Sequence, residues 1–296
     1  MPSSNANSRI WRNLPPYIRQ HLLLLREIQR FLTIEPAILK PLISILNNAL
    51  PGRNYALEHM IQALDAARQC GWIDDEPLTA TVKIHPLFAG FLRTQPYDPD
   101  QEKIVHSITA FYSAYANYLL DQYLQSGADE LRLEGLKVVF YEFFNFERAL
   151  YHAMATQEDF LHLYHLLDRA LDADEDHLRR LYFTRKIIRF AETTDFIDEL
   201  HLLQYVELRS FLADIHYRLG DFSTAETIYR AVLDIFKSRS AHQETAMVLV
   251  NLANILSDQG CYESAIAHYK EAINLVLQYA NPDERMESTE STLQKT

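Results

Sequence analysis

Glycine and cysteine are both scarce in this sequence. Its 296 residues include only 7 Gly, a content that suits helices joined by short turns better than a loop-rich β protein. The 2 Cys, Cys70 and Cys261, cannot build a disulfide framework, and the polar residues 1–9 show no secretory leader. These absences predict a helical protein of the reducing cytoplasm.

Long apolar runs and catalytic signatures are missing as well. The leucine run Leu22–Leu25 is followed at once by Arg26 and Glu27, so it is far too short for a membrane span. The chain contains no H-E-x-x-H, no C-x-x-C and no G-x-S-x-G. We therefore expect no membrane partner, no catalytic residues, no enzymatic activity and no cofactor.

One pair of histidines has a spacing that metal sites use. His162 and His165 lie three positions apart, close in sequence to Asp159 and Asp168. The same segment also fits an ordinary amphipathic helix with two polar flanking positions, and this is the simpler interpretation. We expect no metal site here.

Charge is distributed unevenly along the chain. Residues 1–99 hold 10 Lys/Arg and 8 Asp/Glu, a balance of +2, and residues 100–296 hold 18 and 32, a balance of −14, which together give the net charge of −12. An acidic array repels nucleic acid and anionic lipid, so nucleic acid is not favoured as a partner. The surplus carboxylates are equally explained as a solvated helix surface.

The strongest pattern is a repeat between residues 208 and 276. Gly220 and Ala225 recur 40 positions later as Gly260 and Ala265, and the other matched pairs are Leu212/Leu252, Phe222/Tyr262, Tyr229/Tyr269 and Val232/Ala272. Paired helices that repeat at a fixed period bury their apolar faces by stacking, and the stack offers an extended binding surface. Both copies resemble the tetratricopeptide repeat, with a period longer than the usual length of about 34 residues.

The first third of the chain lacks this repeat. We expect a flexible lead-in over residues 1–13, because they show no apolar periodicity. A helical pattern follows over residues 17–32, and Thr33 is a candidate cap for a second helix. The second helix carries the stripe Leu39, Leu42, Ile43 and Leu46, and a third runs from Leu57 to about Gly71.

A strand signal comes after these three helices. Residues 79–84 are β-branched and alternating, and Trp72-Ile73 is a candidate partner strand. Three helices followed by a short ribbon predict a winged-helix-like domain over residues 14–96. Beyond the turn at Tyr97–Asp100 the pattern is helical, so we expect an all-α fold with an α-helical repeat superhelix over residues 97–280. The polar residues 281–296 are expected to form a disordered tail.

Two further segments resemble parts of STAND-class signalling ATPases. The run Ile84-His85-Pro86-Leu87-Phe88 resembles the end of their winged-helix domain, and Glu142-x2-Asn145-x3-Ala149-Leu150 resembles the helix that begins their superhelical sensor. The resemblance implies signal transduction, with His85 as a switch candidate because it matches a histidine that touches bound ADP. It also implies a nucleotide-binding domain as a partner, in the same or another chain, since G-x-x-x-x-G-K-[ST] is absent from this sequence.

The repeat register assigns the candidate partner-binding residues. In a tetratricopeptide hairpin the first helix lines the concave face, which by register receives Ser210, Asp214, Tyr217, Asn251, Asn254 and Ser257. Asparagine bonds both the N–H and the C=O of an extended peptide, and Asp214 suits a basic or amide-rich ligand. The principal hypothesis is a non-catalytic module that binds a protein or peptide partner, or senses a ligand.

Two other functions remain open at this point. A transcription regulator would bind DNA through the winged-helix domain and an effector through the repeats. The third helix contains Arg68 but also Glu58 and Asp65, and the wing adds only Lys83. This segment is therefore poor in the cations that a DNA-binding domain needs. An assembly scaffold without any switching is the third hypothesis.

Overall fold

The computed structural model describes residues 4–29, 31–77, 80–124, 128–193 and 199–279. These residues form thirteen α-helices, one π-helical turn and one three-stranded sheet, so the prediction of a mainly helical protein is confirmed. The chain divides after Ala173 into two compact units, which we call unit 1 (residues 1–173) and unit 2 (residues 174–296). The domain boundary predicted between residues 96 and 97 lies inside unit 1.

Unit 1 begins with a mixed helix and strand region. Its elements, in chain order, are α1 (Ser4–Asn13), α2 (Pro16–Leu24), β1 (Phe31–Thr33), α3 (Pro36–Ala49), α4 (Leu57–Gln69), β2 (Ile73–Asp75), β3 (Thr81–Ile84) and α5 (Pro86–Thr94). The strands pair antiparallel in the order β1-β3-β2, with Leu32 and Asp75 both opposite Val82. Ile73 lies opposite Ile84, which confirms the predicted partner strand.

The helix predicted over residues 17–32 ends early, and β1 was missed. Helix α2 stops at Leu24, and successive backbone turns follow in which the N–H groups of residues 25–28 bond to carbonyls three positions back. Leu25 and Ile28 are buried inside these turns, so the apolar spacing continued although the helix did not. Thr33 belongs to β1 and does not cap α3, whose N-cap residue is Glu35.

The first residues are not a lead-in without structure. Residues 4–13 form α1, and the Trp11 side chain is buried, with its ring 5.6 Å from that of Phe91 in an edge-to-face contact. The indole N–H of Trp72 donates a hydrogen bond to the buried Asn7 side chain, at 3.1 Å. The segment contains too few apolar residues for a periodicity argument, and its order comes from aromatic contacts with distant residues.

The remainder of unit 1 consists of long helices. They are α6 (Gln101–Leu119), which continues into the π-helical turn η1 (Leu120–Leu124), then α7 (Asp129–Thr156) and α8 (Leu161–Ala173). Helix α6 packs against α3, α7 and α8, and α7 also contacts β1. The core of this unit therefore runs without interruption from the sheet into α6 and α7.

A row of polar side chains on α7 holds the segment around β1. Glu142 is buried, and its carboxylate accepts hydrogen bonds from the Thr33 backbone N–H, at 2.6 Å, and from the Tyr112 hydroxyl, at 2.6 Å. One turn further along, the Asn145 side-chain oxygen accepts from the Gln29 backbone N–H, at 2.7 Å. These bonds pair backbone groups of the first third of the chain with side chains more than a hundred residues away.

Arg148 continues the same row with a charged contact. Its guanidinium donates to the Glu27 backbone oxygen, at 2.8 Å, and to the Glu27 carboxylate, which also accepts from Gln101 at 2.6 Å. Glu27 is buried, and burying a carboxylate is costly unless it is paired and hydrogen bonded. The pairing explains why this glutamate is tolerated in the core between α2, α6 and α7.

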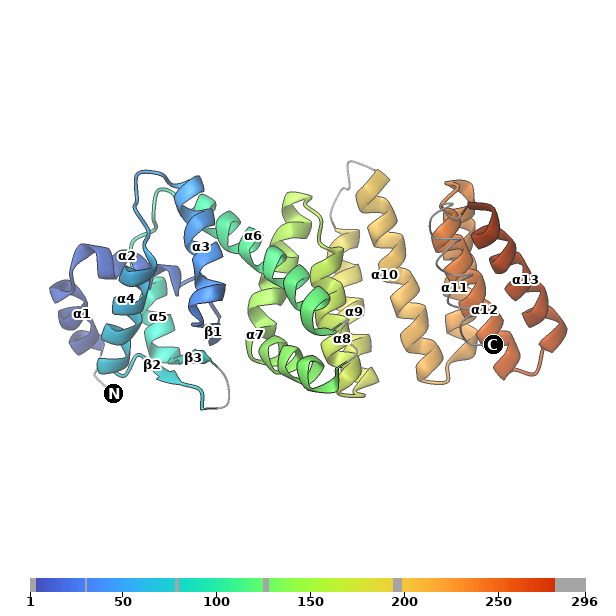
Figure 1. Cartoon of the computed structure of the whole chain (residues 1–296), viewed down its shortest axis with the longest axis horizontal. Helices are drawn as coiled ribbons and strands as arrows, with labels where there is room; N and C mark the ends of the chain where they lie inside the picture. Colours follow the sequence, from blue (N-terminus) through green and yellow to red (C-terminus); the bar gives the residue numbers. More distant parts are fainter. Residues whose placement is uncertain (1–3, 30, 78–79, 125–127, 194–198, 280–296) are drawn as a thin grey trace. The chain divides into compact units, whose positions relative to one another are not determined.

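Unit 2 is a stack of antiparallel helices. Its elements are α9 (His177–Glu192), α10 (Glu199–Arg218), α11 (Phe222–Ser238), α12 (His242–Asp258) and α13 (Tyr262–Tyr279), and each packs against the next (Figure 1). Gly220 and Gly260 have φ of +77° and +79° in the two equivalent turns, a conformation that favours glycine. Ala225 and Ala265 are fully packed just after them, which allows close helix approach. The predicted 40-residue repeat is confirmed.

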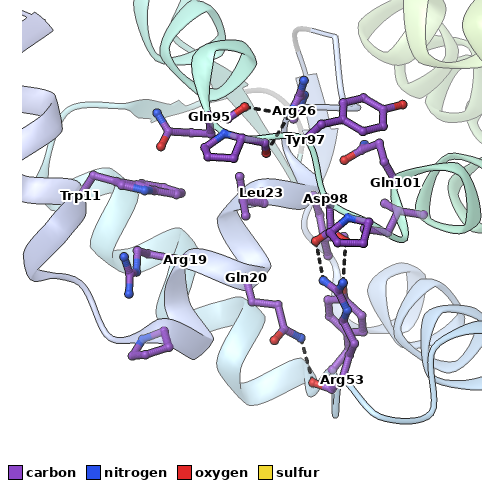
Figure 2. Close-up of a pocket in the computed structure, with 16 residues that line it drawn as sticks. Trp11, Arg19, Gln20, Leu23, Arg26, Arg53, Gln95, Tyr97, Asp98 and Gln101 are labelled. Atoms are coloured by element: carbon purple, nitrogen blue, oxygen red, sulfur yellow. Dashed lines mark hydrogen bonds and ion pairs between the residues drawn. The ribbon is translucent and has the colours of Figure 1, made fainter.

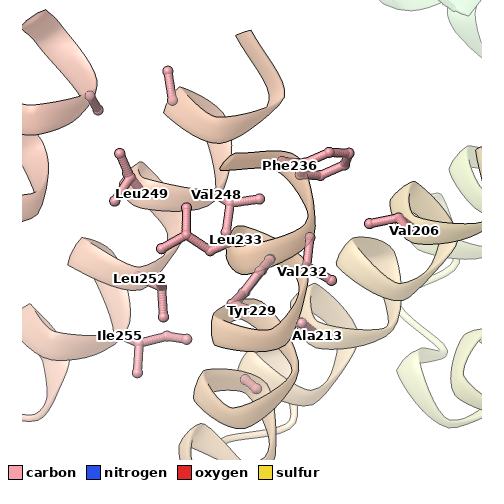
Figure 3. Close-up of a cluster of buried hydrophobic side chains, with 13 residues drawn as sticks. Val206, Ala213, Tyr229, Val232, Leu233, Phe236, Val248, Leu249, Leu252 and Ile255 are labelled. Carbon is pink, nitrogen blue, oxygen red and sulfur yellow. The ribbon is translucent and has the colours of Figure 1, made fainter. Parts of the chain in front are cut away.

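The core of unit 2 is built by α11 between its neighbours. Figure 3 shows the labelled side chains of α11, Tyr229, Val232, Leu233 and Phe236, lying between Val206 and Ala213 of α10 and Val248, Leu249, Leu252 and Ile255 of α12. Helix α11 thus buries apolar side chains against both of its neighbours, as stacked repeats require. The tail predicted over residues 281–296 lies outside the described residues.

Replacing Glu142 by Gln tests the polar row. The glutamine side chain has only one oxygen, so it cannot accept from all the donors around position 142. Its NH2 group would face either the Thr33 N–H on one side or the Tyr112 hydroxyl and the Asn145 side chain on the other. We expect Glu142→Gln to lower the free energy of unfolding by about 1–3 kcal/mol. Trp11 and Trp72 account for both Trp of the chain and lie in unit 1, so urea unfolding followed by tryptophan fluorescence reports this unit.

The matched control is Glu130→Gln, on the exposed first turn of the same helix. This substitution removes the same charge without disturbing a buried donor, and it is expected to leave the midpoint of urea unfolding nearly unchanged. Equal effects of the two substitutions would contradict a specific contribution of the buried carboxylate.

Candidate functional site

A cavity of about 220 Å³ opens among four helices of unit 2. Helix α10 contributes positions 207, 210, 211 and 214, and α12 contributes positions 244, 247, 248 and 251, so each helix presents one face at the same spacing. Helix α9 adds Arg180, and α11 adds Tyr229 and Phe236. The full lining is Arg180, Glu207, Ser210, Phe211, Asp214, Tyr229, Phe236, Glu244, Met247, Val248 and Asn251.

Three of the six predicted partner-binding residues meet at this cavity. Ser210, Asp214 and Asn251 all line it, from two different helices. The other three lie outside its lining. The Tyr217 hydroxyl donates to Asp258 at 2.6 Å, Asn254 accepts a hydrogen bond from the Tyr269 hydroxyl, and Ser257 is half-buried on α12. The structure uses Tyr217 and Asn254 to join neighbouring helices.

Asp214 is engaged more heavily than the sequence indicated. Its carboxylate accepts from the Arg180 guanidinium at 3.3 Å and from Arg218 at 3.3 Å. Arg180 is 5 % exposed and is therefore a nearly buried cation that needs this carboxylate. Asp214 is therefore already paired within unit 2, and its preference for a basic or amide-rich ligand stays a prediction.

The cavity is lined by charged and apolar side chains together. Glu207, Asp214 and Glu244 line it with Arg180, and Arg218 binds Asp214 from outside the lining. The side chains of Phe211, Phe236, Met247 and Val248 supply apolar surface between them. A long side chain with an apolar stem and a cationic head matches this combination.

Two neutral polar groups complete the site. The Ser210 hydroxyl is buried and has no hydrogen-bond partner among the described residues. Tyr229 is also buried, and desolvation, followed by the nearby Asp214 charge, raises the pKa of its hydroxyl. Tyr229 therefore stays neutral, and Ser210 has an unused hydrogen-bonding capacity at the cavity wall.

Sequence reasoning missed eight of the eleven residues that line this cavity. Glu207 and Glu244 lie one helical turn or two before the predicted Ser210, Asp214 and Asn251, so the same face periodicity could have found them. No local signal could have found Arg180, because it precedes its partner Asp214 by 34 positions on another helix.

His85, the switch candidate, lies in unit 1 at the start of α5. Its side-chain Nδ1 accepts a hydrogen bond from the Leu87 backbone N–H at 3.2 Å, and its own backbone N–H donates to the Trp72 oxygen at 2.9 Å. The histidine thus acts as the N-cap of α5, ahead of Pro86 at the first helical position. Its role as a switch stays a prediction.

Unit 1 has a cavity of its own, of about 370 Å³, beside the segment that follows α5 (Figure 2). The Arg53 guanidinium donates to both carboxylate oxygens of Asp98 and, at 2.9 Å, to Asp100. Arg26 donates to the Gln95 backbone oxygen at 3.3 Å and lies 5.2 Å from the centre of the Tyr97 ring. These contacts fasten the predicted interdomain turn to the N-terminal elements, so it is not a free linker.

The histidine pair and the candidate DNA-reading helix lie outside both cavities. His162 on α8 lies 3.7 Å from Asp159, which precedes that helix, and the described part of the chain contains no group of three His, Cys, Asp or Glu placed to hold a metal ion. Arg68, the cation of the candidate DNA-reading helix, is bound by Asp65 at 2.6 Å and Asp75 at 2.9 Å. None of the described helices has the length and apolar content needed to cross a membrane.

Comparisons with known proteins bear on unit 2. Residues 204–282 match the tetratricopeptide repeat family. The match begins within α10 and includes α11, α12 and α13, and thus contains most of the cavity lining. No curated protein matches the sequence.

One solved structure similar to the chain is a Signal Transduction ATPase with Numerous Domains (STAND) protein with a tetratricopeptide repeat sensor, from Pyrococcus horikoshii. The two sequences are 15% identical and the TM-score is 0.30, with 95% of this chain and 47% of that chain covered. This chain therefore spans about half the length of that protein. A match with a TM-score this low is no basis for assigning residue roles or an activity to this chain.

The Arg53–Asp98 contact predicts a pH-dependent stability. Hydrogen bonds from Arg53 hold the pKa of Asp98 below its ordinary value of 3.8. The stabilisation is therefore complete above the unfolded-state pKa, and it is lost as the pH falls through the lower folded-state pKa. We expect Asp98→Asn to lower the free energy of unfolding of unit 1 by about 1–3 kcal/mol at neutral pH.

The difference between the original protein and Asp98→Asn should shrink as the pH falls below 3.8. Urea unfolding followed by tryptophan fluorescence at several pH values measures it. Asp121→Asn, at an exposed residue of the same unit, is the control. A difference that stays constant down to acid pH would show that an ionised Asp98 does not stabilise the turn.

Proposed function

We propose that unit 2 is a non-catalytic module that binds an extended segment of a partner protein and takes one lysine or arginine side chain into the α9–α12 cavity. The observation that carries the proposal is the lining of this cavity, in which three carboxylates and one arginine lie beside apolar side chains within and next to the tetratricopeptide region. Tetratricopeptide repeats are typically modules for binding proteins or peptides, which supports this class of function.

The size and lining of the cavity support a single side chain as its occupant. The stem of a lysine or arginine would pack on Phe211 and Met247, and its head group would lie near Glu207 and Glu244. Met247 is 52 % exposed, so its apolar surface is available to a ligand. A hydrophobic contact and a charge contact would thus be made by the same residue of the partner.

The polar groups on either side support binding of a peptide backbone. Asn251 carries both a donor and an acceptor, and the Ser210 hydroxyl has no partner among the residues that the structure describes. Bonds to the main chain would give affinity with little dependence on the neighbouring side chains. Selectivity would then come mainly from the basic residue in the cavity.

For unit 1 we propose a winged-helix-like domain over residues 14–96 that acts by packing. The order α2-β1-α3-α4-β2-β3, with the three strands in one antiparallel sheet, supports it. The sequence resemblance to STAND proteins supports a nucleotide-binding domain, in the same or another chain, as its partner. DNA binding is less well supported, because both carboxylates near Arg68 neutralise the main cation of α4.

Peptide binding can be measured with short alanine-based probes. Three fluorescein-labelled peptides differ only at the central residue, which is lysine, norleucine or glutamate, and binding to the full chain is followed by fluorescence polarisation at low salt. We expect the lysine peptide to bind most tightly and Glu244→Gln to weaken it by about threefold, the size of a partly exposed charge contact. Added salt should reduce the difference.

Glu263→Gln is the matched control. Glu244 and Glu263 lie in the first turns of α12 and α13, so each substitution removes one negative charge near the N-terminus of a helix. Only Glu244 lines the cavity. The proposal fails if norleucine binds as tightly as lysine, or if the two substitutions have equal effects.

A further inference from the structure

A second ligand site can be argued in unit 1 from the end of α6. There the helix changes to the π-helical turn η1, in which residues five apart lie on the same side. Tyr118 and Tyr123 are five apart, and their ring centroids lie 5.8 Å from one another at an angle of 67°. In an uninterrupted α-helix residues five apart would diverge, so the π-turn brings these two rings together.

Helix α7 fixes this arrangement from the other side. A Cβ at Gly135 would lie 2.6 Å from the Tyr123 Cβ, a distance that no other residue could accept without a shift. Glycine therefore allows α7 to approach the π-turn closely and hold Tyr123 in place. A π-helical segment costs regular hydrogen bonding, and such segments occur frequently at functional sites.

The two rings border a cavity of about 330 Å³ between α3, the sheet, α6 and α7. Tyr115 lines it as well, with its ring centroid 6.3 Å from that of Tyr118. Tyr118 is 45 % exposed, so one aromatic wall is open to a ligand. Three tyrosines from a single helical segment thus line one side of this cavity.

The charges around this cavity are mainly negative. Glu35 and Glu134 line it, against the single cation Lys137. Both carboxylates lie close enough to raise the pKa of the Tyr123 hydroxyl, although the hydrogen bond to Tyr118 is the larger cause. An ammonium group in this space would meet aromatic rings and carboxylates together.

We propose that the tyrosine cavity of unit 1 binds a small organic cation with a methylated ammonium head group. Aromatic rings attract such cations through their negative faces, and the methyl groups reduce the cost of leaving water. The two carboxylates add a favourable potential that a neutral ligand would not feel. The site lies in a different unit from the peptide cavity, so neither proposal depends on the other.

A matched pair of probes separates charge from shape. Choline and 3,3-dimethylbutan-1-ol have the same form, but only choline carries a charge. Each is titrated into the full chain, with binding measured by saturation-transfer NMR and isothermal calorimetry. We expect choline to bind at least about fivefold more tightly than the alcohol, the range of a cation–π contact. Equal binding would reduce the site to an apolar cavity and overturn the proposal.

Substitutions at Tyr118 and Glu134 test where choline binds. Tyr118→Phe keeps the aromatic face and should retain choline binding, whereas Tyr118→Leu should weaken it about fivefold or more. Glu134→Gln should weaken choline binding about twofold to threefold, and Glu130→Gln, one turn earlier on α7, should leave it unchanged. Both glutamates are exposed, so neither change should affect folding, and tryptophan fluorescence checks this in unit 1.

Two results would contradict the location. If Tyr118→Leu binds choline as well as the original protein, the rings do not form the site. If Glu130→Gln and Glu134→Gln weaken binding equally, choline responds only to the overall negative charge of the chain. Absence of saturation transfer from the protein to choline would exclude the site altogether.

Discussion

The buried Glu142 carboxylate is the contact on which the arrangement of unit 1 depends. A carboxylate without water is costly, and here the cost is offset by donors from three places: the β1 backbone, Tyr112 of α6, and Asn145 on its own helix. Desolvation still raises the pKa of Glu142, so these donors do not remove the whole cost. Such a group tolerates few alternative packings, and it therefore fixes where α7 lies against the sheet and α6.

The same helix face extends this constraint to the rest of unit 1. Asn145 holds the backbone before β1, and Arg148 neutralises the buried Glu27, which in turn binds Gln101 at the start of α6. The Arg53 contacts fasten the turn that joins α5 to α6. The sheet region and the helical region, which look separate in the sequence, are therefore joined by polar contacts. The same contacts attach the turn at residues 97–100 to the N-terminal elements.

Unit 2 is organised by packing of a different kind. Small residues after each turn glycine bring paired helices together, and α11 fills the space between α10 and α12 with aromatic and aliphatic side chains. The faces of α10 and α12 that remain accessible converge on a cavity whose charge is set by Glu207, Asp214, Glu244 and Arg180. Outside the cavity, the Tyr217 hydroxyl joins α10 to α12 and the Tyr269 hydroxyl joins α13 to α12. Asp214 and Asn254, which are 40 positions apart, therefore differ in their setting: Asp214 lines the cavity and Asn254 bonds to Tyr269.

Local patterns in the sequence predicted the helical class, the 40-residue repeat, the helix from Leu57, and the pairing of Ile73 with the strand ending at Ile84. Spacing of apolar residues and turn glycines over a few positions determines each of these. The repeat register also assigned Ser210, Asp214 and Asn251 to one predicted face, and all three line the cavity.

Only the tertiary structure decided that Asp214 is bound by Arg180, that residues 4–13 are helical, and that Thr33 lies in a strand bonded to Glu142. The physical reason is that these outcomes depend on partners 34, 65 and 109 positions away, and no local periodicity records such contacts.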